Sequence, residues 1–550
     1  MRAEVLIKNG RILDGTGAPE EKGDLVIAGG KIAALGRVSE SVDADEVVEA
    51  SGKVVAPGFI DIHSHGDLVL AWPADDRLAL IEGRVAQGIT TEIVGNCGLG
   101  AVPLFGAGLE LLPRINGWMT PAPFEWVWSG VDEYLRHLEG IGIAVNVGTL
   151  VPHGPLRLGA QALSSGDTTE GARKVMLAAL DAALEEGAFG LSAGLIYPPG
   201  MYTSTEELSC LAERVARHDR VFTCHIRGSS ETLLDAVSEL VQIGREAGVH
   251  VHHSHAEAVG RSHWSRLSRF LQMEDEAREE GVRVSADMFP YTVAATMMLA
   301  IFPPWSLEGG LPRLIERLTD TATRERIRRD IDTVSPEWPP WKEGGWPHNL
   351  VKAVGWDRIR VSTVGSERNR AAEGSSLQEL GRARGQDPFD AVADLMIEEE
   401  GNVGQFVEDI SGEDGLRTLV SRPEIAFVTD ANDYGKGKPH PAAYGSFPRV
   451  LGRYVRRERL LALPEAVRRM TSLPAEILGI ENRGILKAGA FADVVTFDAD
   501  VIEDLASLEE PRRKAKGIDR VFVNGRCVYR NSSLTGAVPG MALRAAGRSP

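Results

Sequence analysis

The strongest constraint on the fold is a repeated alternation of short apolar segments with segments of helical period through the middle of the chain. Repeated strand–helix units with apolar strands indicate a parallel sheet that is buried on both faces. Eight such units favour a (β/α)8 barrel over residues 58–479, although a doubly wound open sheet has the same local pattern. Helical segments include 171–187 and 229–247. The predicted strands are 59–63, 90–95, 143–149, 188–193, 220–225, 248–255, 282–287 and 424–429.

The two ends of the chain resemble each other and differ from the middle. Residues 3–56 contain short alternating strands separated by turn residues, and the same pattern returns after residue 492. A small set of hairpins at one end would be only marginally stable by itself. We therefore expect residues 1–57 and 480–550 to form one small discontinuous β-sandwich domain.

One stretch interrupts the strand–helix rhythm. Residues 300–357 contain Pro303-Pro304-Trp305 and Trp346-Pro347, which are too irregular for a barrel unit. We predict that this stretch is an inserted subdomain or lid within the barrel.

Charge and cysteine content exclude several classes of protein. The chain has 78 acidic and 60 basic residues, a net charge of −18 and a pI near 5.3, which argues against a binder of nucleic acid or anionic membranes. The N-terminus lacks the apolar stretch of a signal peptide, and no segment approaches the ~18 apolar residues of a membrane span. The four cysteines are far apart and form no disulfide framework. We expect a soluble cytoplasmic protein, either a monomer or a homo-oligomer.

The most informative local motif is His63-Ser64-His65, at the end of the first barrel strand. Side chains two residues apart in a strand point the same way, so both imidazoles would lie on one face. Two neutral imidazoles in this arrangement can bind zinc or a similar ion. The alternative is a pair of unrelated surface histidines, but barrels keep their active sites at the carboxyl ends of their strands.

Further candidate ligands follow other predicted strands. Cys97 comes after the second strand; it is either a small buried apolar residue or, near the histidines, a thiolate ligand. His225 ends another strand, while its neighbour Cys224 faces the opposite way and is interpreted as structural. Asp430 ends the last strand, where a carboxylate is either a turn former or a ligand and general base.

The segment His250-Val-His-His-Ser-His255 contains more histidines than one site can use. Strand alternation would place His253 with His255 on one face, and His250 with His252 on the other. We interpret His255 as the ligand because it is nearest the carboxyl end, and the others as packing or supporting groups. His63, His65, Cys97, His225, His255 and Asp430 converge only if the strands close into a barrel.

Several of these motifs together resemble the N-acyl-D-amino-acid deacylase (D-aminoacylase) family of the amidohydrolase superfamily. The resemblance covers almost the whole chain. It includes LIKNGRILDGTG near the N-terminus, PGFIDIHSHGD at 57–67, GITTEIVGNCG at 88–98, GAFGLSAGLIY at 187–197, DMFPYT at 287–292 and GSFPRVLG at 445–452. The cysteine after the second strand is particularly diagnostic, because most relatives use a carboxylated lysine to bridge two metals.

The resemblance implies a zinc-dependent hydrolase of amide C–N bonds acting on a small-molecule amide. Cys97, His225 and His255 would hold one tightly bound zinc ion, and His63 and His65 a second, weaker one. Asp430 would lie near both as the general base.

Tyr197 is either a donor to the developing oxyanion or a core aromatic residue. Arg227 is a candidate for orienting the substrate or a supporting carboxylate. Tyr291, in the family-like DMFPYT motif, is a further candidate for substrate binding.

Three functions remain open at this stage. The first is a linear amide deacylase of the D-aminoacylase type, the second is hydrolysis of a cyclic amide, imide or carbamate, and the third is a catalytically silent scaffold. Release of an amine and a carboxylate from an open-chain substrate separates the first from the second. A scaffold would have lost ligands, and none of the six positions has.

The chain departs from its family at two positions expected to hold the substrate α-carboxylate. The family has lysine where this chain has Glu257, and arginine where it has Ala442. An unpaired charge in a dry pocket costs roughly 3–5 kcal/mol, so we expect a substrate without a free α-carboxylate. The argument does not hold if Arg261 or Lys438 pairs with the substrate carboxylate from another direction. It also does not hold if Glu257 is exposed to solvent.

Overall fold

Strands from the two ends of the chain meet in one nine-stranded sheet. This computed structural model describes residues 1–38, 42–73, 76–339 and 345–546. The sheet order is β21-β20-β19-β18-β5-β1-β2-β3, with β4 also paired to β1. Its strands are β1 (Arg2–Ile12), β2 (Glu21–Ala28), β3 (Lys31–Gly36), β4 (Asp43–Glu49), β5 (Val54–Pro57), β18 (Val494–Phe497), β19 (Ile518–Val523), β20 (Arg526–Arg530) and β21 (Ser533–Leu534).

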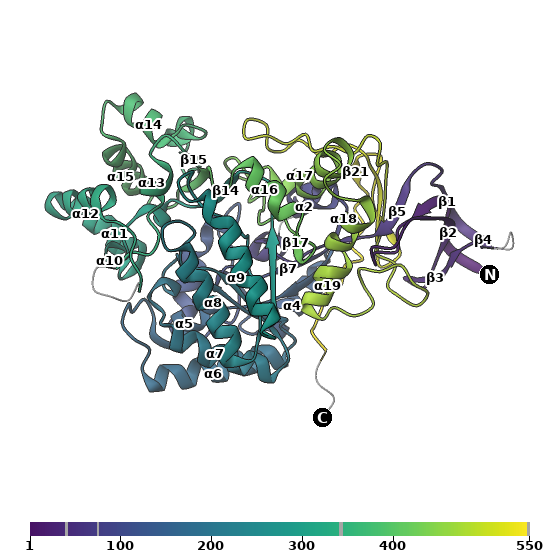
Figure 1. Cartoon of the computed structure of the whole chain (residues 1–550), viewed down its shortest axis with the longest axis horizontal. Helices are drawn as coiled ribbons and strands as arrows, with labels where there is room; N and C mark the ends of the chain where they lie inside the picture. Colours follow the sequence, from purple (N-terminus) through teal and green to yellow (C-terminus); the bar gives the residue numbers. More distant parts are fainter. Residues whose placement is uncertain (39–41, 74–75, 340–344, 547–550) are drawn as a thin grey trace.

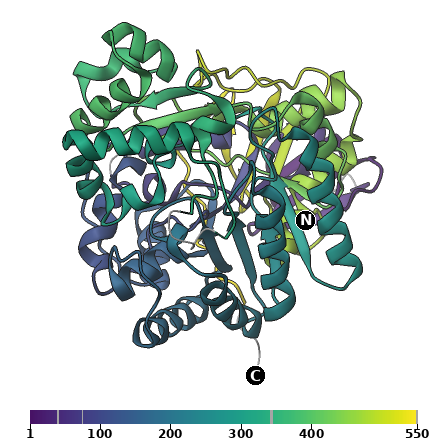
Figure 2. The ribbon, with the colours of Figure 1, turned by 60° about the vertical axis from the view of Figure 1, so that its left-hand side comes forward.

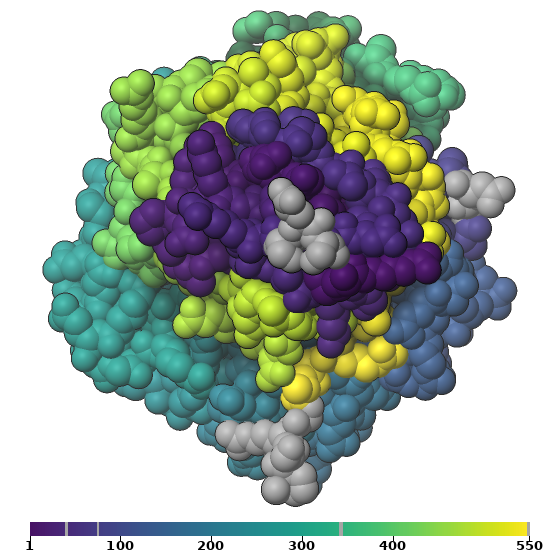
Figure 3. All heavy atoms as spheres, turned by 90° about the vertical axis from the view of Figure 1, so that its right-hand side faces the viewer, coloured from purple at the N-terminus to yellow at the C-terminus, as the bar shows by residue number. Residues whose placement is uncertain are grey.

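The junction between the two ends is the antiparallel pair β5–β18, in which Val55 lies opposite Thr496. Apolar side chains from both ends, including Ile7, Leu25, Val494 and Phe522, share one buried core. In the space-filling view the N-terminal and C-terminal segments cover the same face of the molecule (Figure 3).

The eight predicted strands of the middle region are present and lie side by side in chain order. Two sheets, β6-β7-β8 and β9-β10-β11-β12-β13-β17, contain them, with β8 and β9 separated only by Leu150. The hydrogen bond from Asp430 N to His63 O, 2.9 Å long, joins the loop after β17 to the loop after β6 and completes the ring. With the short β9, which was not predicted, the two sheets contain nine strands among the described residues: β6 (Phe59–Asp61), β7 (Ile89–Val94), β8 (Asn146–Thr149), β9 (Val151–Pro152), β10 (Gly190–Gly194), β11 (Val221–His225), β12 (His250–His253), β13 (Val284–Met288) and β17 (Ile425–Phe427).

Helices surround these strands, as the helical period of the linking segments predicts (Figures 1 and 2). The segment 171–187 forms α6 (Glu170–Glu185), which begins where the Thr169 side chain accepts a hydrogen bond from Ala172 N. The other helices of this shell are α1 (Asp67–Leu70), α2 (Arg77–Val85), α3 (Gly108–Ile115), α4 (Val131–Ile141), α5 (His153–Gln161), α7 (Thr205–Arg217), α8 (Leu233–Ala247), α9 (Leu267–Glu279), α16 (Glu413–Val420), α17 (Ala442–Arg449), α18 (Leu463–Met470) and α19 (Ser472–Leu478).

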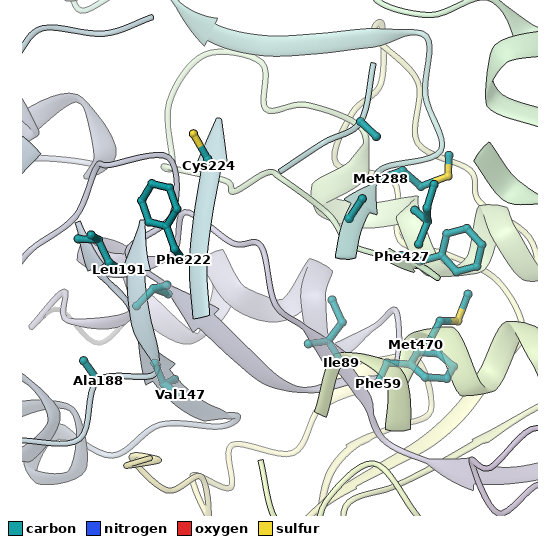
Figure 4. Close-up of a cluster of buried hydrophobic side chains, with 14 of the residues drawn as sticks. Phe59, Ile89, Val147, Ala188, Leu191, Phe222, Cys224, Met288, Phe427 and Met470 are labelled. Atoms are coloured by element: carbon teal, nitrogen blue, oxygen red, sulfur yellow. The ribbon is translucent and has the colours of Figure 1, made fainter. Parts of the chain in front are cut away.

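The main hydrophobic core lies between strands and helices. It includes Phe59, Phe222, Phe427 and Met470, and Cys224 belongs to it, as its structural interpretation predicted (Figure 4). A second cluster contains Ile60, Ile93, Phe189 and Val428 from four different strand segments, together with residues of α19. Apolar strands therefore bury side chains on both faces, and the polar groups gather at the strand ends.

The interrupted stretch 300–357 packs as part of a larger unit. A separate antiparallel sheet in the order β14-β16-β15 combines residues on both sides of it, and these strands share a core with the surrounding helices. Residues 340–344 lie outside the described part of the chain. The unit contains β14 (Val293–Met297), β15 (Ile359–Thr363), β16 (Gly404–Glu408), α10 (Pro304–Leu307), α11 (Gly310–Thr319), α12 (Thr321–Thr333), α13 (Leu350–Val354), α14 (Leu377–Arg384) and α15 (Pro388–Glu398).

Within the described ranges, no helix is long and apolar enough to cross a membrane.

Candidate active site

The six predicted ligand residues come together at the carboxyl ends of the barrel strands. His225 is the last residue of β11, and the other five stand in the loops just after β6, β7, β12 and β17. Their ligand atoms form two overlapping groups, and within each group all atoms lie within 4.8 Å of one another. Cys97 belongs to both groups.

The first group contains His63, His65, Cys97 and Asp430. The Nε2 atoms of His63 and His65 each lie 3.2 Å from Asp430 Oδ1. The Nε2 atom of His63 also lies 3.2 Å from Cys97 Sγ. The strand β6 ends at Asp61, so the two imidazoles meet through the loop after the strand.

The second group contains Cys97, His225 and His255. His255 Nε2 lies 2.7 Å from His225 Nδ1 and 3.7 Å from Cys97 Sγ. Two imidazole nitrogens and one sulfur that face a common point are the donor set that zinc prefers.

Three of the six residues have a left-handed backbone. The φ angles are 53° at Cys97, 40° at His255 and 46° at Asp430. For residues other than glycine this conformation costs about 1–2 kcal/mol each. Such conformations are concentrated at functional sites, where the surrounding structure holds them.

The chain turns at His255, so the alternation of side-chain directions that holds in a strand does not extend to this residue. The prediction that His253 and His255 share a face was wrong, because β12 ends at His253 and the chain then turns. His253 points to the helix side, where its Nδ1 lies 2.7 Å from Glu274 Oε1 on α9. His252 instead points to the metal-binding side and contacts Asp287.

Asp287, near the end of β13, is the functional residue that sequence reasoning missed. Its Oδ2 lies 3.0 Å from His63 Nδ1 and 2.9 Å from His252 Nε2, while its Oδ1 accepts the His255 amide at 2.5 Å. It therefore orients the ring of the candidate ligand His63 and fixes the backbone of the candidate ligand His255. A carboxylate near the end of a barrel strand was the available signal.

The buried charges support one another. Burial by itself would raise the pKa of the Cys97 thiol, but His63 and the hydrogen bonds from His225 and His255 hold it well below its ordinary value. Burial likewise opposes ionisation of Asp430, and His63 and His65 outweigh it, so its pKa is also well below the usual range. The site thus favours a thiolate and a carboxylate, the forms that bind a metal cation.

A cavity of about 180 Å3 opens onto this centre. Tyr197 lines it, and its hydroxyl is 2.6 Å from Thr296 Oγ1 of β14. Glu257 lines it as well, with Oε1 3.9 Å from His255 Nδ1. Lys436, Lys438 and His348 also line it. Most of the remaining lining is apolar and comes from the unit built on β14, β15 and β16.

Three predicted substrate-binding residues are not among the described residues that line the cavity. Arg227 is fully buried, and its Nη2 donates to Glu239 Oε1 at 2.9 Å, so its charge holds α8 against the loop after β11. Tyr291 packs behind the wall, against the ring of His440. Ala442 is buried at the start of α17. These three buried residues pack beneath the residues that line the cavity.

The structure removes two of the three alternatives raised for Glu257 and leaves the third, Lys438, in place. The Glu257 side chain is only 12% exposed, so it is not a solvated surface carboxylate. Arg261 is 64% exposed and pairs with Asp409 away from the cavity. Lys438 does line the cavity, and Lys436 joins it.

The fold and site define a metallo-hydrolase barrel, and comparison with known proteins agrees. A model of the amidohydrolase family matches residues 46–529, so the chain belongs to this family. An N-acyl-D-glutamate deacylase of Alcaligenes xylosoxydans xylosoxydans is 33% identical over 96% of this chain and 94% of its own length.

Solved structures give the same result. The N-acyl-D-glutamate deacylase of Bordetella bronchiseptica, crystallised with zinc and a phosphonate mimic of the tetrahedral intermediate, is 33% identical with a TM-score of 0.80, covering 99% of this chain and 100% of its own. A D-aminoacylase structure, whose study concerns a binuclear metal centre with one-metal activation, is 29% identical over 98% of this chain and 100% of its own, also with a TM-score of 0.80. The resemblance seen in the sequence motifs is confirmed.

Proposed function

We propose that this protein is a zinc-dependent hydrolase that cleaves the C–N bond of an open-chain N-acyl amide. The observation that carries the proposal is the convergence of Cys97, His225 and His255 beside Asp430 at the floor of one cavity. A scaffold without activity would have no need to keep this set complete.

The donor set fits zinc. Cys97, His225 and His255 would hold the tightly bound ion, with His63 and His65 forming a second, weaker site that shares Cys97 and Asp430. When bound, zinc supplies a Lewis acid that polarises the amide carbonyl and lowers the pKa of water. Asp287 keeps the ring of His63 in the orientation that leaves its Nε2 free toward the site.

Asp430 and Tyr197 supply the proton transfer and the hydrogen bond that hydrolysis needs. The Asp430 carboxylate takes the proton of the attacking water and passes it to the nitrogen of the departing amine. Burial and the nearby Cys97 and Asp430 charges raise the pKa of Tyr197 above its ordinary value. Its hydroxyl therefore stays protonated at neutral pH and is available to donate to the carbonyl oxygen as negative charge develops there.

The wall beside His255 supports a leaving amine without a free α-carboxylate. Glu257 places a buried carboxyl group close to His255, at a position where the family is expected to have lysine. Ala442, at the other family cation position, is buried and presents no charge. Burial raises the pKa of Glu257 to about 7, so above that pH a substrate carboxylate would meet a buried charge of the same sign. Such an unpaired charge costs roughly 3–5 kcal/mol, which corresponds to a loss of about 10²–10⁴-fold in affinity.

Lys436 and Lys438 favour a second candidate, an N-acyl-D-amino-acid deacylase of ordinary specificity. Both line the cavity. Burial lowers the pKa of Lys436 to about 8, and no carboxylate pairs with it among the described residues. An ammonium of this kind would pair with a substrate carboxylate inside the cavity.

A substrate panel distinguishes the two candidates. Zinc-loaded enzyme is given N-acetyl-D-amino acids and the corresponding amides, esters and decarboxylated amines, together with cyclic amides, and the released amine is measured. Our proposal requires the compounds without a carboxylate to have a higher kcat/KM than the free acids. It also requires the E257Q variant to reduce this difference in kcat/KM.

The contrary outcomes are also clear. If the free acids are hydrolysed best and K436M abolishes that preference, the enzyme is an ordinary deacylase. If only the cyclic compounds react, it is a cyclic amidase. Absence of both zinc and turnover would identify a scaffold.

A further inference from the structure

His348 is a buried imidazole on the cavity wall that the hydrolytic mechanism does not use. It is 6% exposed and lines the cavity next to α13. Its neighbours hold it from both sides. Pro347 O accepts the Thr232 hydroxyl at 2.5 Å, and the Asn349 side-chain amide donates to Ile331 O at 2.8 Å. The ring is therefore fixed between the loop after β11 and the inserted unit.

The hydrogen bonds of this ring determine its tautomer. The main-chain N–H of Ser229 donates to His348 Nδ1 at 3.3 Å. A peptide N–H can only donate, so Nδ1 must be the nitrogen without a proton. The Ser230 hydroxyl lies 3.2 Å from the same atom.

Burial keeps the ring neutral, since it lowers the pKa of His348 to about 3, with His225 and His263 adding to the effect. In a neutral ring with a bare Nδ1, the hydrogen is on Nε2. No described residue accepts a hydrogen bond from that atom. His348 therefore offers a neutral donor to whatever occupies the cavity.

Glu257 provides an acceptor next to this donor. The Ser229 side chain is near enough to the Glu257 carboxyl to lower its pKa, while the backbone N–H of the same residue donates to His348. The hydrogen bond from Val259 N to Ser229 O, 2.6 Å long, fixes the loops together. One residue thus connects a donor and an acceptor that both line the cavity near His255.

We propose that His348 and Glu257 together recognise a primary carboxamide on the leaving amine, so that the substrates are N-acyl amino-acid amides. The carboxamide oxygen would accept from His348 Nε2–H, and its NH2 group would donate to Glu257. This inference rests on the proposed function, and it names the group that replaces the α-carboxylate. A free carboxylate has no hydrogen to donate to Glu257, and an ammonium has no acceptor for the His348 N–H, so only the carboxamide matches both groups.

The test compares four substrates that share one acetyl group and one leucine-like side chain, and the three that have a chiral α-carbon are supplied as both enantiomers. They are the primary amide, the methyl ester, the free acid and the alkylamine without a carbonyl. A neutral hydrogen bond contributes a factor of about 2–10, and a buried donor left unpaired costs more. We expect wild-type enzyme to prefer the primary amide over the alkylamine by about 10–100-fold in kcat/KM.

The variants H348F and H348Q isolate the donor. H348F keeps a ring of similar shape without a donor and should lower that preference about tenfold, while H348Q keeps an N–H and should restore most of it. Zinc content and melting temperature are measured for both variants, because a purely structural role for His348 would change these and leave the substrate ratio alone. If H348F misfolds, H348Q must still favour the primary amide over the alkylamine.

The inference is overturned if folded H348F has the same ratio of kcat/KM for the primary amide and the alkylamine as the wild-type enzyme. Equal hydrolysis of the primary amide and the alkylamine by wild-type enzyme also overturns it. These results differ from failure of the proposed function, in which zinc-loaded wild-type enzyme hydrolyses none of the four compounds or favours the free acid.

Discussion

Replacing Asp287 by asparagine should weaken zinc binding although Asp287 is not expected to touch the metal. The carboxylate faces three groups: His63 Nδ1, His252 Nε2 and the His255 amide. Asparagine has the same shape but only one acceptor oxygen, and its NH2 group needs an acceptor in return. If the oxygen stays with His255 N, the NH2 group faces the rings of His63 and His252.

The consequence for His63 is a change of tautomer. Its Nδ1 would accept from the new NH2 group, so the proton would move to Nε2, the atom that lies 3.2 Å from both Cys97 Sγ and Asp430 Oδ1. A protonated Nε2 cannot bind a metal. Loss of such a supporting partner typically lowers metal affinity or activity 10–100-fold, which is about 1.4–2.8 kcal/mol.

The assay is a zinc titration of D287N against a competing chelator, with melting temperature measured in parallel. D61N is the matched control, because Asp61 is equally buried and contacts the main chain of His63 but not its ring. We expect D61N to change stability and D287N to change zinc affinity at the site that includes His63. Unchanged zinc affinity in D287N would refute the tautomer argument.

Other predictions address the remaining parts of the account. C97S should lose zinc on dialysis against chelator that leaves wild-type protein loaded, because an alcohol is a poorer ligand than a thiolate; equal retention would remove Cys97 from the site. D430N should keep its tightly bound zinc and lose about 10²–10⁴-fold in turnover, and near wild-type rates would exclude Asp430 as the base. In the buried cluster of Glu207, His153 and Arg157, burial raises the pKa of Glu207 but its partners lower it to about 2. The lowering from 4.5 contributes about 3 kcal/mol of stability, which is present above pH 4.5 and is lost as the pH falls toward 2. E207Q should therefore be less stable than wild type at pH 7 and nearly equal to it near pH 2, as measured by denaturant unfolding; an equal difference at both pH values would contradict this.

The barrel strands and the meeting of the candidate metal ligands were predictable because both leave local signals. Apolar strands alternating with helices fix the order of the units, and parallel strands place their carboxyl ends together. His63, His65 and Cys97 were therefore expected at one place without knowledge of any distance. All six candidate ligands do meet there.

What was missed depends on turns and on partners far apart in sequence. The prediction that His253 shares a face with His255 was wrong because side chains alternate only within a strand, and β12 ends at His253. The role of Asp287 depends on groups more than 200 residues away as well as on nearby ones, so no local pattern revealed it. Arg227 comes two residues after the candidate ligand His225, yet its guanidinium pairs with Glu239, which only the packing of α8 shows.

The inserted unit was underestimated for a related reason. Its tryptophans and prolines marked residues 300–357, whereas its sheet is completed by β14 and β16 on either side. Antiparallel strands of five residues have the same appearance as barrel strands in a sequence. His348, which this unit contributes to the cavity, was consequently not recognised as a candidate.

The central claim is that Cys97, His225 and His255 hold the zinc ion that hydrolysis requires. The most direct measurement is a crystal structure of the zinc-loaded protein, with data collected on both sides of the zinc absorption edge. The account predicts an anomalous peak about 2.3 Å from Cys97 Sγ and about 2.0–2.1 Å from a ring nitrogen of both histidines. A peak bound elsewhere, with the Cys97 sulfur well beyond bonding distance, would contradict it.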